Sequence, residues 1–213
     1  MEKQRVSVNE YALQVCNSQD DLMEIARLRY HAYRSVDAIR ENPDGLFTDN
    51  YDFQQNTKSC MVYEENQLVS SIRACVYSPT LNYNHIPAFE VYKDDIKEAL
   101  GLDKVIVESN RFVISHDKAE SKSLFKIPFR FIVLNLNKFD GDYVITAVRE
   151  KHVPLYRRFL TMEPISQPKR YPGLDVDMVL LAGDVKNGIE ALVRREEIYA
   201  IPQEEVASYW SMG

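Results

Sequence analysis

The sequence predicts a single mixed α/β domain in which helices cover both faces of a β-sheet. Segments with the apolar period of a helix alternate along the chain with short apolar runs that are typical of strands. The run at residues 105–115 is apolar on both faces, which is typical of a central strand. The length of 213 residues suits one large domain. These observations place the chain in the α/β class.

The expected elements follow the order helix, strand pair, strand, helix, strand, helix, strand. Helical signals open the chain, and the first clear helix covers residues 18–37, with Ser18 as its N-cap. The runs at 59–64 and 67–77 form an antiparallel hairpin. The elements around the strand at 105–115 are a helix at 93–101, a helix at 121–138, a strand at 143–148, a helix at 153–160, a strand at 174–182 and a terminal helix at 188–198.

Three segments of this domain have different expected roles. We expect residues 1–57 to be a helical, mobile N-terminal segment over the site. Residues 58–183 are expected to form the core, and residues 184–213 a C-terminal helix and tail.

The composition is that of an ordinary soluble globular protein, with 45% hydrophobic and 27% charged residues. No apolar run approaches the roughly 20 residues of a membrane span. The N-terminus lacks the apolar core of a signal peptide, so we expect a cytoplasmic protein. Cys16, Cys60 and Cys75 show neither close pairing nor zinc-ligand spacing, and we expect reduced thiols and no metal.

The net charge of −6 argues against general nucleic-acid binding. The charge is unevenly distributed, because the stretch from Lys118 to Arg170 holds eleven Lys and Arg but five Asp and Glu. A basic region in an acidic protein favours an anionic partner on that side. A solvated helix face explains the same pattern equally well.

One arginine is out of place on the first helix. The apolar positions that share one face of this helix are Leu22, Ile25, Ala26, Ala32, Tyr33 and Val36. Arg29 falls in the middle of that face. A guanidinium keeps its charge in a protein, so its burial requires anionic partners. We therefore expect a buried charge network of the kind that clusters at functional sites. Its candidate members are Asp49, Asp52, Arg73, Glu108 and Arg111.

These residues form a spaced set with a known counterpart. Tyr33 follows Arg29 by four residues, Asp49 and Asp52 frame the run Asp-Asn-Tyr-Asp, Arg73 lies in Ser-Ser-Ile-Arg-Ala, and Glu108 and Arg111 lie in Glu-Ser-Asn-Arg-Phe. The set resembles the acyl-homoserine lactone synthases and their relatives, the N-acyl amino acid synthases. The run His152-Val-Pro-Leu-Tyr-Arg-Arg-Phe-Leu is similar to a helix of GNAT acyltransferases. The resemblance covers residues 20–182. It implies the GNAT fold, with a mostly antiparallel sheet and a bulged central strand, and acyl transfer from a thioester to an amine.

Two departures from the family pattern narrow the expected substrates. The glycine-rich pyrophosphate loop is absent after the central strand, which favours an acyl carrier protein over coenzyme A as the donor, with no permanently bound cofactor. An acidic carrier would contact the basic side chains Lys118, Lys122, Lys126, Arg130, Arg157 and Arg158. The lactone synthases carry a Trp shortly after the helix aromatic, whereas the one Trp of this chain is Trp210. This difference favours a free amino acid over S-adenosylmethionine as the acceptor.

The reaction needs a group that takes a proton from the attacking amine. We expect Glu108 to be this base, because it lies on the strand where the thioester should end. Ion pairing with Arg111 or Arg29 is its alternative role. Glu108 and Arg111 are three residues apart and point to opposite faces of a regular strand. The GNAT resemblance implies a bulge, so we expect an irregularity at 109–111, where backbone N–H groups at Ser109 and Asn110 bind the thioester carbonyl.

The other charged residues are expected to order the 38–57 segment over the acceptor. They are Arg29, Asp49, Asp52, Arg73 and Arg111, and one of the arginines is a candidate for binding the acceptor carboxylate. A purely structural cluster is the alternative. Tyr33 is a further candidate contact, although the helix core suits it better. The candidates for an acyl tunnel, with plain core packing as the alternative, are Phe125, Phe129, Phe131 and Ile132.

The sequence thus predicts an N-acyltransferase that moves a long-chain fatty acyl group from acyl carrier protein to the amine of an amino acid. An acyl-homoserine lactone synthase that uses S-adenosylmethionine is the first alternative. A non-catalytic GNAT-like protein that binds an acyl chain or a protein partner is the second. We expect neither nucleic-acid binding nor integral membrane association.

Overall fold

The computed structural model describes residues 5–210, except for the side chains of Lys122, Phe159, Asn187, Ile189, Glu190 and residues 208–210. The strands are β1 (Val6–Val8), β2 (Tyr11–Val15), β3 (Thr57–Glu64), β4 (Gln67–Tyr77), β5 (Ile106–Ile114), β6 (Tyr143–Val148), β7 (Glu163–Pro164), β8 (Lys169–Arg170) and β9 (Asp177–Asp184). The α-helices are α1 (Gln19–Arg34), α2 (Phe89–Leu100), α3 (Lys122–Phe139), α4 (Val153–Leu160), α5 (Val185–Arg195) and α6 (Gln203–Trp210).

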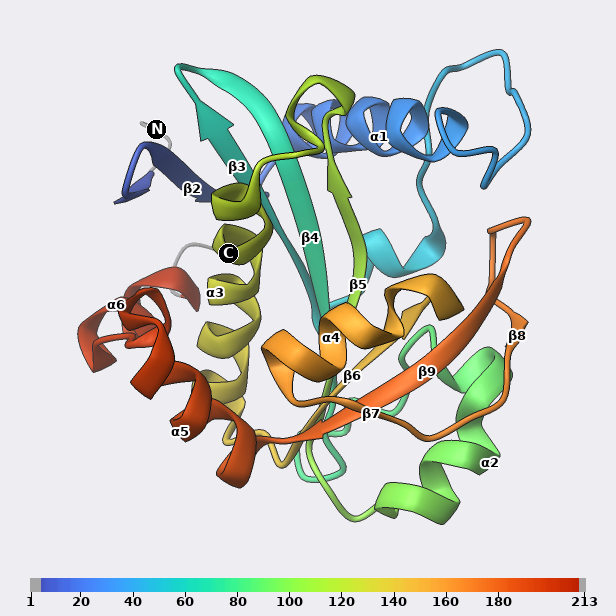
Figure 1. Cartoon of the computed structure of the whole chain (residues 1–213), viewed down its shortest axis with the longest axis vertical. Helices are drawn as coiled ribbons and strands as arrows, with labels where there is room; N and C mark the ends of the chain where they lie inside the picture. The colour runs from blue at the N-terminus through green and yellow to red at the C-terminus, as the bar shows by residue number, and fades with distance from the viewer. Residues whose placement is uncertain (1–4, 211–213) are drawn as a thin grey trace.

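The strands form one sheet in the order β1-β2-β3-β4-β5-β6-β9-β7, with β8 also paired to β9. Neighbouring strands are antiparallel except for β5 and β6, which are parallel. Figure 1 shows this twisted sheet with helices packed around it. The predicted α/β class, with a mostly antiparallel sheet, is therefore confirmed.

The two faces of the sheet bury different cores. On one face, α3 packs against β4 and β5 through residues such as Leu124, Ile127 and Ile72. On the other face, α2 contributes Tyr92 and Ile96 to a second cluster, and α1 packs against β4 and β5. Side chains alternate between the faces along each strand, so the sequence of β5 supplies both cores. Among the described residues, no helix is both long and apolar enough to cross a bilayer.

The first helix is shorter than the sequence predicts. The Ser18 hydroxyl accepts a hydrogen bond from the backbone N–H of Asp21, which confirms the N-cap. The helix ends at Arg34, and Val36 therefore lies beyond it with half of its surface exposed. The expected place of Val36 on the buried face is wrong. Ile25 and Ala26 are fully buried, as is Arg29 beside them.

The described part of the chain begins with strands, and the prediction of a helical N-terminus is wrong for residues 6–15. β1 and β2 form a hairpin, and β2 pairs with β3 in antiparallel register. Tyr11, Leu13 and Val15 are buried, which is the period-two pattern of a strand. That pattern was present in the sequence, but five residues are too few to separate it from a helical start.

The remaining elements agree with their predicted bounds or differ from them by a few residues. The hairpin of β3 and β4, the strand β6 and the helix α4 agree with the prediction. The expected strand at 174–182 instead covers Asp177–Asp184, because Tyr171–Val176 forms a loop that packs back on the molecule. The expected terminal helix is two helices, α5 and α6. The expected helix at 93–101 already begins at Phe89 and ends before Gly101, whose φ is +79°.

Candidate active site

Glu108 lies where the sheet opens. β5 and β6 pair from Ile106↔Tyr143 to Glu108↔Ile145. Beyond this pair both strands continue, to Ile114 and Val148, with no further pairing between them in the described chain. Figure 1 shows the two strands diverging, with α4 over the space between them. The edge of β5 that follows Glu108 therefore faces an opening in the sheet instead of a neighbouring strand.

The Glu108 carboxylate is fully buried and surrounded by hydrogen-bond donors. The backbone N–H of Ala88 donates to Oε2 at 2.8 Å. The Asn110 amide donates to Oε1 at 2.9 Å, and the Tyr171 hydroxyl donates to the same oxygen at 2.5 Å. Burial raises the pKa of Glu108, and these three hydrogen bonds oppose that rise without cancelling it. A carboxylate with a raised pKa is a better proton acceptor than an ordinary one.

A bulge interrupts β5 immediately after Asn110. The register with β4 passes from Arg73↔Asn110 to Ser71↔Val113, so two residues of β5 oppose one residue of β4. Arg111 lies in the bulge with a φ of +52°, a conformation that few non-glycine residues adopt. The predicted irregularity at 109–111 is thereby confirmed. Its consequence is that Arg111 reaches the same face of the sheet as Asn110, which a regular strand would forbid.

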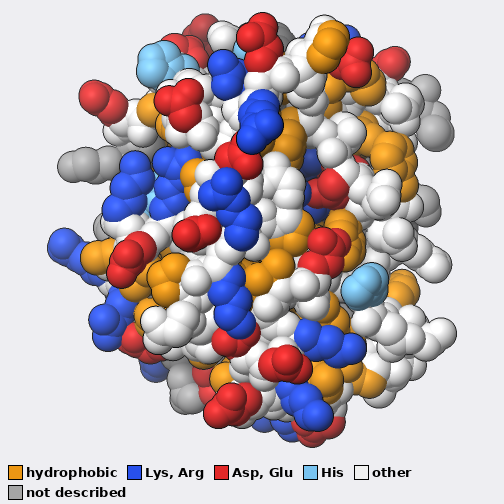
Figure 2. Space-filling view, turned by 90° about the vertical axis from the view of Figure 1, so that its right-hand side faces the viewer, with side chains coloured by type: hydrophobic (Ala, Val, Ile, Leu, Met, Phe, Trp, Pro, Cys, Tyr) orange, Lys and Arg blue, Asp and Glu red, His pale blue; other side chains and the backbone are white. Residues whose placement is uncertain are grey.

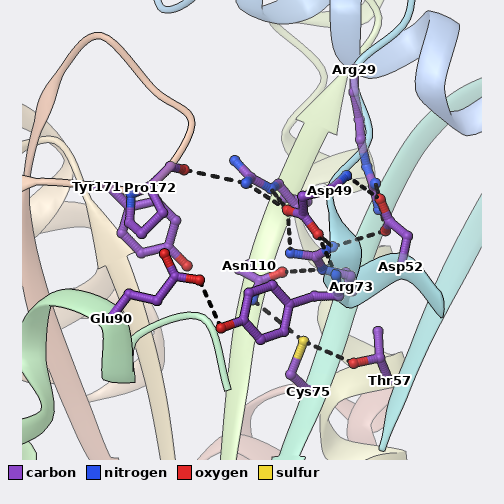
Figure 3. Close-up of polar contacts among 12 residues, drawn as sticks. Arg29, Asp49, Asp52, Thr57, Arg73, Cys75, Glu90, Asn110, Tyr171 and Pro172 are labelled. Carbon is purple, nitrogen blue, oxygen red and sulfur yellow. Dashed lines mark hydrogen bonds and ion pairs between the residues drawn. The ribbon is translucent and has the colours of Figure 1, made fainter. Parts of the chain in front are cut away.

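Five charged residues form a continuous chain of ion pairs on this face. Arg29 donates from Nη1 to both oxygens of Asp52, at 2.8 and 3.0 Å. Arg73 donates to Asp52 at 2.8 Å and to Asp49 at 2.6 and 3.0 Å. Arg111 donates to Asp49 from Nε and Nη2, at 3.1 and 2.7 Å. Figure 3 shows Arg29, Asp52, Arg73 and Asp49 converging from α1, β4 and the segment between them. The predicted network is present with its predicted members.

The network continues to Glu108 through one amide. Arg73 donates from Nε to the Asn110 carbonyl oxygen at 2.7 Å, and the Asn110 amide nitrogen donates to Glu108. Asn110 therefore links the ion pairs to the buried carboxylate. Direct ion pairing of Glu108 with Arg29 or Arg111, the alternative role for this residue, is not among its hydrogen bonds and ion pairs in the described structure.

Local hydrogen bonds position the two aspartates independently of their ion pairs with the arginines. Asp49 caps the 3₁₀ turn Asn50–Phe53, and Asp52 accepts from the Asp49 backbone N–H, so the two form a reciprocal capping box. Burial opposes ionisation of both carboxyls. The hydrogen bonds and charges of the adjacent arginines outweigh burial and hold the pKa of Asp49 and of Asp52 below its ordinary value. Both aspartates are therefore anionic at neutral pH.

Tyr33 reaches this network through an aromatic ring that the sequence did not single out. The Tyr33 ring packs edge-on against Phe47 at 5.0 Å. The Arg111 guanidinium lies over Phe47 at 4.7 Å and over the Tyr171 ring at 5.8 Å. Stacking of this kind fixes the plane of a guanidinium. Tyr33 is half-buried at the margin of the network, and its role as a substrate contact stays a prediction.

Tyr171 is the main functional candidate that the sequence reasoning missed. It is buried, it bonds to Glu108, and it comes from the loop between β8 and β9, which Figure 3 shows beside Pro172. The pair is separated by 63 residues, and nothing in Tyr-Pro-Gly except a turn signal distinguishes this position. Only tertiary folding brings the phenol to the carboxylate.

Cys75 lies beside the site but is not a nucleophile. Its Sγ is 3.3 Å from the Thr57 hydroxyl and 3.6 Å from the Asn110 amide. Burial raises the pKa of this thiol to about 11, although the nearby Arg73 charge lowers it in part. The thiol is therefore protonated at neutral pH, and the thiolate is the reactive form.

An apolar cavity lies on the opposite face of β5. Its wall includes Ser109, the next residue after Glu108, together with Phe129, Ile132, Leu136, Val144, Leu160 and Leu192. Phe129 and Ile132 were expected in an acyl tunnel, and they line this cavity. Phe125 lines a separate groove that shares Leu160 and Leu192 with it. Phe131 packs in the main core, which was its alternative role, and it is not among the residues described for this wall.

The basic side chains expected to bind a carrier protein occupy different environments. Lys118 pairs with Glu64 and Lys126 pairs with Glu196, each at 2.5 Å. Arg157 is exposed and pairs with Glu163, and Arg158 is exposed beside it. The side chain of Lys122 lies outside the described residues.

Arg130 does not fit the expected carrier-binding role. It is buried, and it binds Glu205 and the Ile198 carbonyl. Its guanidinium therefore links α6 to α3 and is not available at the surface to bind a partner. The helical period of the sequence did not show that the C-terminal segment folds over this position.

The site combines three chemical capabilities. A buried carboxylate with a raised pKa can accept a proton. The free edge of β5 beyond Glu108 presents backbone groups at an opening in the sheet, where N–H donors stabilise developing negative charge. The cavity behind Ser109 has an apolar wall, which suits an apolar chain better than a polar one. These features suit transfer of an apolar acyl group to a nucleophile that must lose a proton.

Comparison with known proteins agrees with a site that is suited to acyl transfer. The family model "N-acyl amino acid synthase FeeM" matches residues 24–184. The structure of FeeM, an N-acyl amino acid synthase from uncultured soil microbes, is similar with a TM-score of 0.70 and 13% identity, over 84% of this chain and 93% of that one. The CoA-dependent acyl-homoserine lactone synthase MesI gives a TM-score of 0.61 and 17% identity, over 89% and 96%. The acyl-homoserine lactone synthase LasI gives 0.60 and 14%, over 81% and 89%. No curated protein matches the chain by sequence.

The structural likenesses are below 25% identity and establish the fold that these proteins share. The family model is the more specific finding, because it spans the network residues Arg29, Asp49, Asp52, Arg73 and Arg111 together with Glu108. By this match over most of its length, the chain belongs to the FeeM family of N-acyl amino acid synthases and has the GNAT-like fold of that family.

Proposed function

We propose that the protein transfers a long-chain fatty acyl group from acyl carrier protein to the amine of a free amino acid. One observation carries the proposal. Glu108 is the last residue of β5 that pairs with β6, and Ser109, which follows it, lines an apolar cavity on the other face. An acyl thioester that enters the opening therefore has its chain beside Ser109 and its carbonyl beside a buried base.

The proposed reaction uses this arrangement in one addition and one elimination. The amino acid arrives as an ammonium ion, and Glu108 accepts its proton, directly or through water. The amine then attacks the thioester carbonyl, and the oxyanion is stabilised by a backbone N–H group at Ser109 or Asn110, whichever of the two points away from β4. The C–N bond forms and its nitrogen loses its second proton, the C–S bond breaks, and the carrier leaves as a thiolate that takes up this second proton. The first proton passes from Glu108 to water.

The loop before α3 supports a carrier protein as donor. The segment from Ser115 to Ser121 contains no glycine, and its backbone forms the short 3₁₀ turn His116–Lys118. It lacks the glycine-rich backbone that commonly binds a pyrophosphate. A carrier-bound chain presents a phosphopantetheine without the pyrophosphate of coenzyme A, and the acidic carrier complements exposed arginines such as Arg157.

Two alternatives make different products. A lactone synthase would use S-adenosylmethionine, and the missing Trp after Tyr33 weighs against it. A non-catalytic binding protein would retain the acyl cavity without turnover. The buried base at the strand opening favours catalysis, since a carboxylate with a raised pKa is costly to maintain without a use.

The decisive experiment supplies the purified protein with long-chain acyl carrier protein and separately with acyl-CoA. Each donor is combined with a mixture of the twenty amino acids or with S-adenosylmethionine. Mass spectrometry should detect an N-acyl amino acid, faster from the carrier-bound donor. An acyl-homoserine lactone as the main product would establish the first alternative. Binding of the donor with no product from any pair would establish the second.

A further inference from the structure

The charge network on the acceptor side contains an unsatisfied donor. Three guanidinium groups, those of Arg29, Arg73 and Arg111, share two carboxylates, those of Asp49 and Asp52. The Nη1 atom of Arg111 is buried and has no hydrogen-bond partner. A buried donor without a partner costs free energy, most of all on a charged group. We propose that Arg111 binds the α-carboxylate of the acceptor through Nη1, an inference that rests on the function proposed above.

The rest of the Arg111 guanidinium is already held in place. Its Nε and Nη2 atoms donate to Asp49, and Nη2 also donates to the Pro172 carbonyl at 3.3 Å. The rings of Phe47 and Tyr171 lie against the guanidinium. A cation fixed on these sides, with the NH2 group at Nη1 left over, is preorganised for an anionic oxygen. Arg29 also has an unpartnered Nε, but its two terminal nitrogens are bound to Asp52 and Ser59.

The position of Tyr171 relates this arginine to the base. Tyr171 contacts Arg111 through its ring and bonds to Glu108 through its hydroxyl. An α-amino acid carries its amine and its carboxylate on the same carbon, so the groups that bind them must be close neighbours. Glu108 and Arg111 both lie next to the same phenol, one at its hydroxyl and the other at its ring face. The carboxylate of the acceptor then lies at Arg111 while its amine faces Glu108.

An open cleft lies beside this position, on the outer side of the loop that contains Tyr171 and Pro172. Its wall contains Ile39, Arg40, Glu90, Val91 and the residues 170–175. The same loop contacts Arg111 from within, through the Pro172 carbonyl and through Gly173, where an added Cβ would lie 3.5 Å from Nη2. The cleft lies on the side of the molecule that carries β8 and α2, and Figure 2 shows acidic and basic side chains interspersed on that side. This cleft of mixed polarity is the proposed entry side for the acceptor, which then passes the loop at residues 170–175 to reach Arg111.

The experiment compares the best acceptor amino acid from the assay above with its carboxamide, which keeps the amine and loses the negative charge. The wild-type protein should prefer the acid by about 10- to 100-fold in kcat/KM, the range of a hydrogen bond to a charged group. Arg111→Gln should reduce this ratio to near one, chiefly through the KM of the acid.

Arg29→Lys is the matched control, because it disturbs the same network away from the proposed site. It should slow the acid and the amide alike and leave their ratio unchanged. A merely structural role of Arg111 would produce that same pattern in Arg111→Gln, and this result would overturn the inference.

A binding measurement on the wild-type protein covers the case in which Arg111→Gln fails to fold. The N-acyl amino acid product should raise the melting temperature more than the corresponding N-acyl amide does. Equal shifts would mean that Nη1 is satisfied by water only, and the inference would fail. Absence of any acylated product would contradict the proposed function itself, so the two failures are distinguishable.

Discussion

The two faces of the sheet at β5 differ in how they hold a ligand. On one face, Glu108 and Asn110 join a network in which nearly every buried charge is bonded to another. On the other face, Ser109 borders a cavity lined by apolar side chains. Successive residues of one strand thus serve an ionic site and an apolar site. The strand itself is the partition between them, because alternate side chains point to opposite faces.

The two faces therefore differ in the substitutions that they can tolerate. Buried charges need complete pairing in fixed geometry, so a single substitution leaves an uncompensated ion and a large penalty. Apolar packing has no directional requirement, and a change of volume alters which chain fits. The polar face is therefore expected to determine whether the reaction proceeds and the apolar face to determine which acyl chain is used. The following predictions test this division, from the largest expected effect to the smallest.

Glu108→Gln should lower kcat by about 10²- to 10⁴-fold, the usual contribution of a general base. Burial raises the pKa of Glu108, and the base must be ionised to act. The wild-type kcat/KM should therefore fall as the pH drops through that raised pKa. The glutamine variant should lack this acidic limb. The measurement is the pH–rate profile of both proteins, with circular dichroism as the control for folding. Full activity in Glu108→Gln would remove this residue from the mechanism.

Asp52→Asn should destabilise the protein by about 3–5 kcal/mol, because it leaves the buried Arg29 and Arg73 without their shared carboxylate. Urea denaturation measures the change. Glu163→Gln is the matched control, since it breaks the exposed pair with Arg157 and should cost at most about 1 kcal/mol. Similar losses of stability in the two variants would show that the buried network stabilises the protein no more than an exposed ion pair does.

Acid titration of stability tests the same pairs without mutation. The pKa of Asp49 and of Asp52 is lowered in the folded protein. Their stabilisation is fully present above the unfolded value of about 3.9 and is lost as the pH falls through the lower folded values. Asp52→Asn should flatten this acidic loss. If the unfolding free energy of Asp52→Asn depended on acidic pH as steeply as that of the wild type, the assigned ionisation of Asp52 would be contradicted.

Val144→Phe should shift donor preference toward shorter chains, by about tenfold in the ratio of long-chain to short-chain kcat/KM. Val144 lines the cavity, and a larger side chain there costs about 1–3 kcal/mol when space is short. Ile72→Val is the control, because Ile72 is buried in the core outside the described cavity wall and the change costs about 0.5–1.5 kcal/mol. A changed chain preference in this control would show that general destabilisation is responsible.

The smallest effect is expected at the surface. Arg157→Gln combined with Arg158→Gln should raise the KM for an acyl carrier protein donor by about three- to tenfold and weaken its salt dependence, as for other rim charges. The rate with acyl-pantetheine, which has no carrier, should be unchanged and serves as the control. An equal effect on both donors would exclude α4 as the docking surface.

Much of the fold followed from local patterns. The hairpin of β3 and β4, the cap at Ser18 and the central strand β5 were predictable because each rests on interactions between near neighbours in the chain. The N-terminal hairpin was missed, since five residues such as Tyr11–Val15 carry too weak a period and their burial depends on pairing with β3. The position of Arg130 was also misjudged, because its partner Glu205 is 75 residues away.

The sequence by itself determined which residues carry charge into the core. Arg29 on an apolar helix face and the spacing of Asp49, Asp52, Arg73, Glu108 and Arg111 were sufficient, because an ion cannot be buried without partners. Only the tertiary structure decided how these residues meet. The bulge at Arg111, the opening of β5 from β6 and the approach of Tyr171 to Glu108 arise from strand register and loop packing between distant segments. No local pattern encodes these contacts, because their geometry exists only after the whole sheet has assembled.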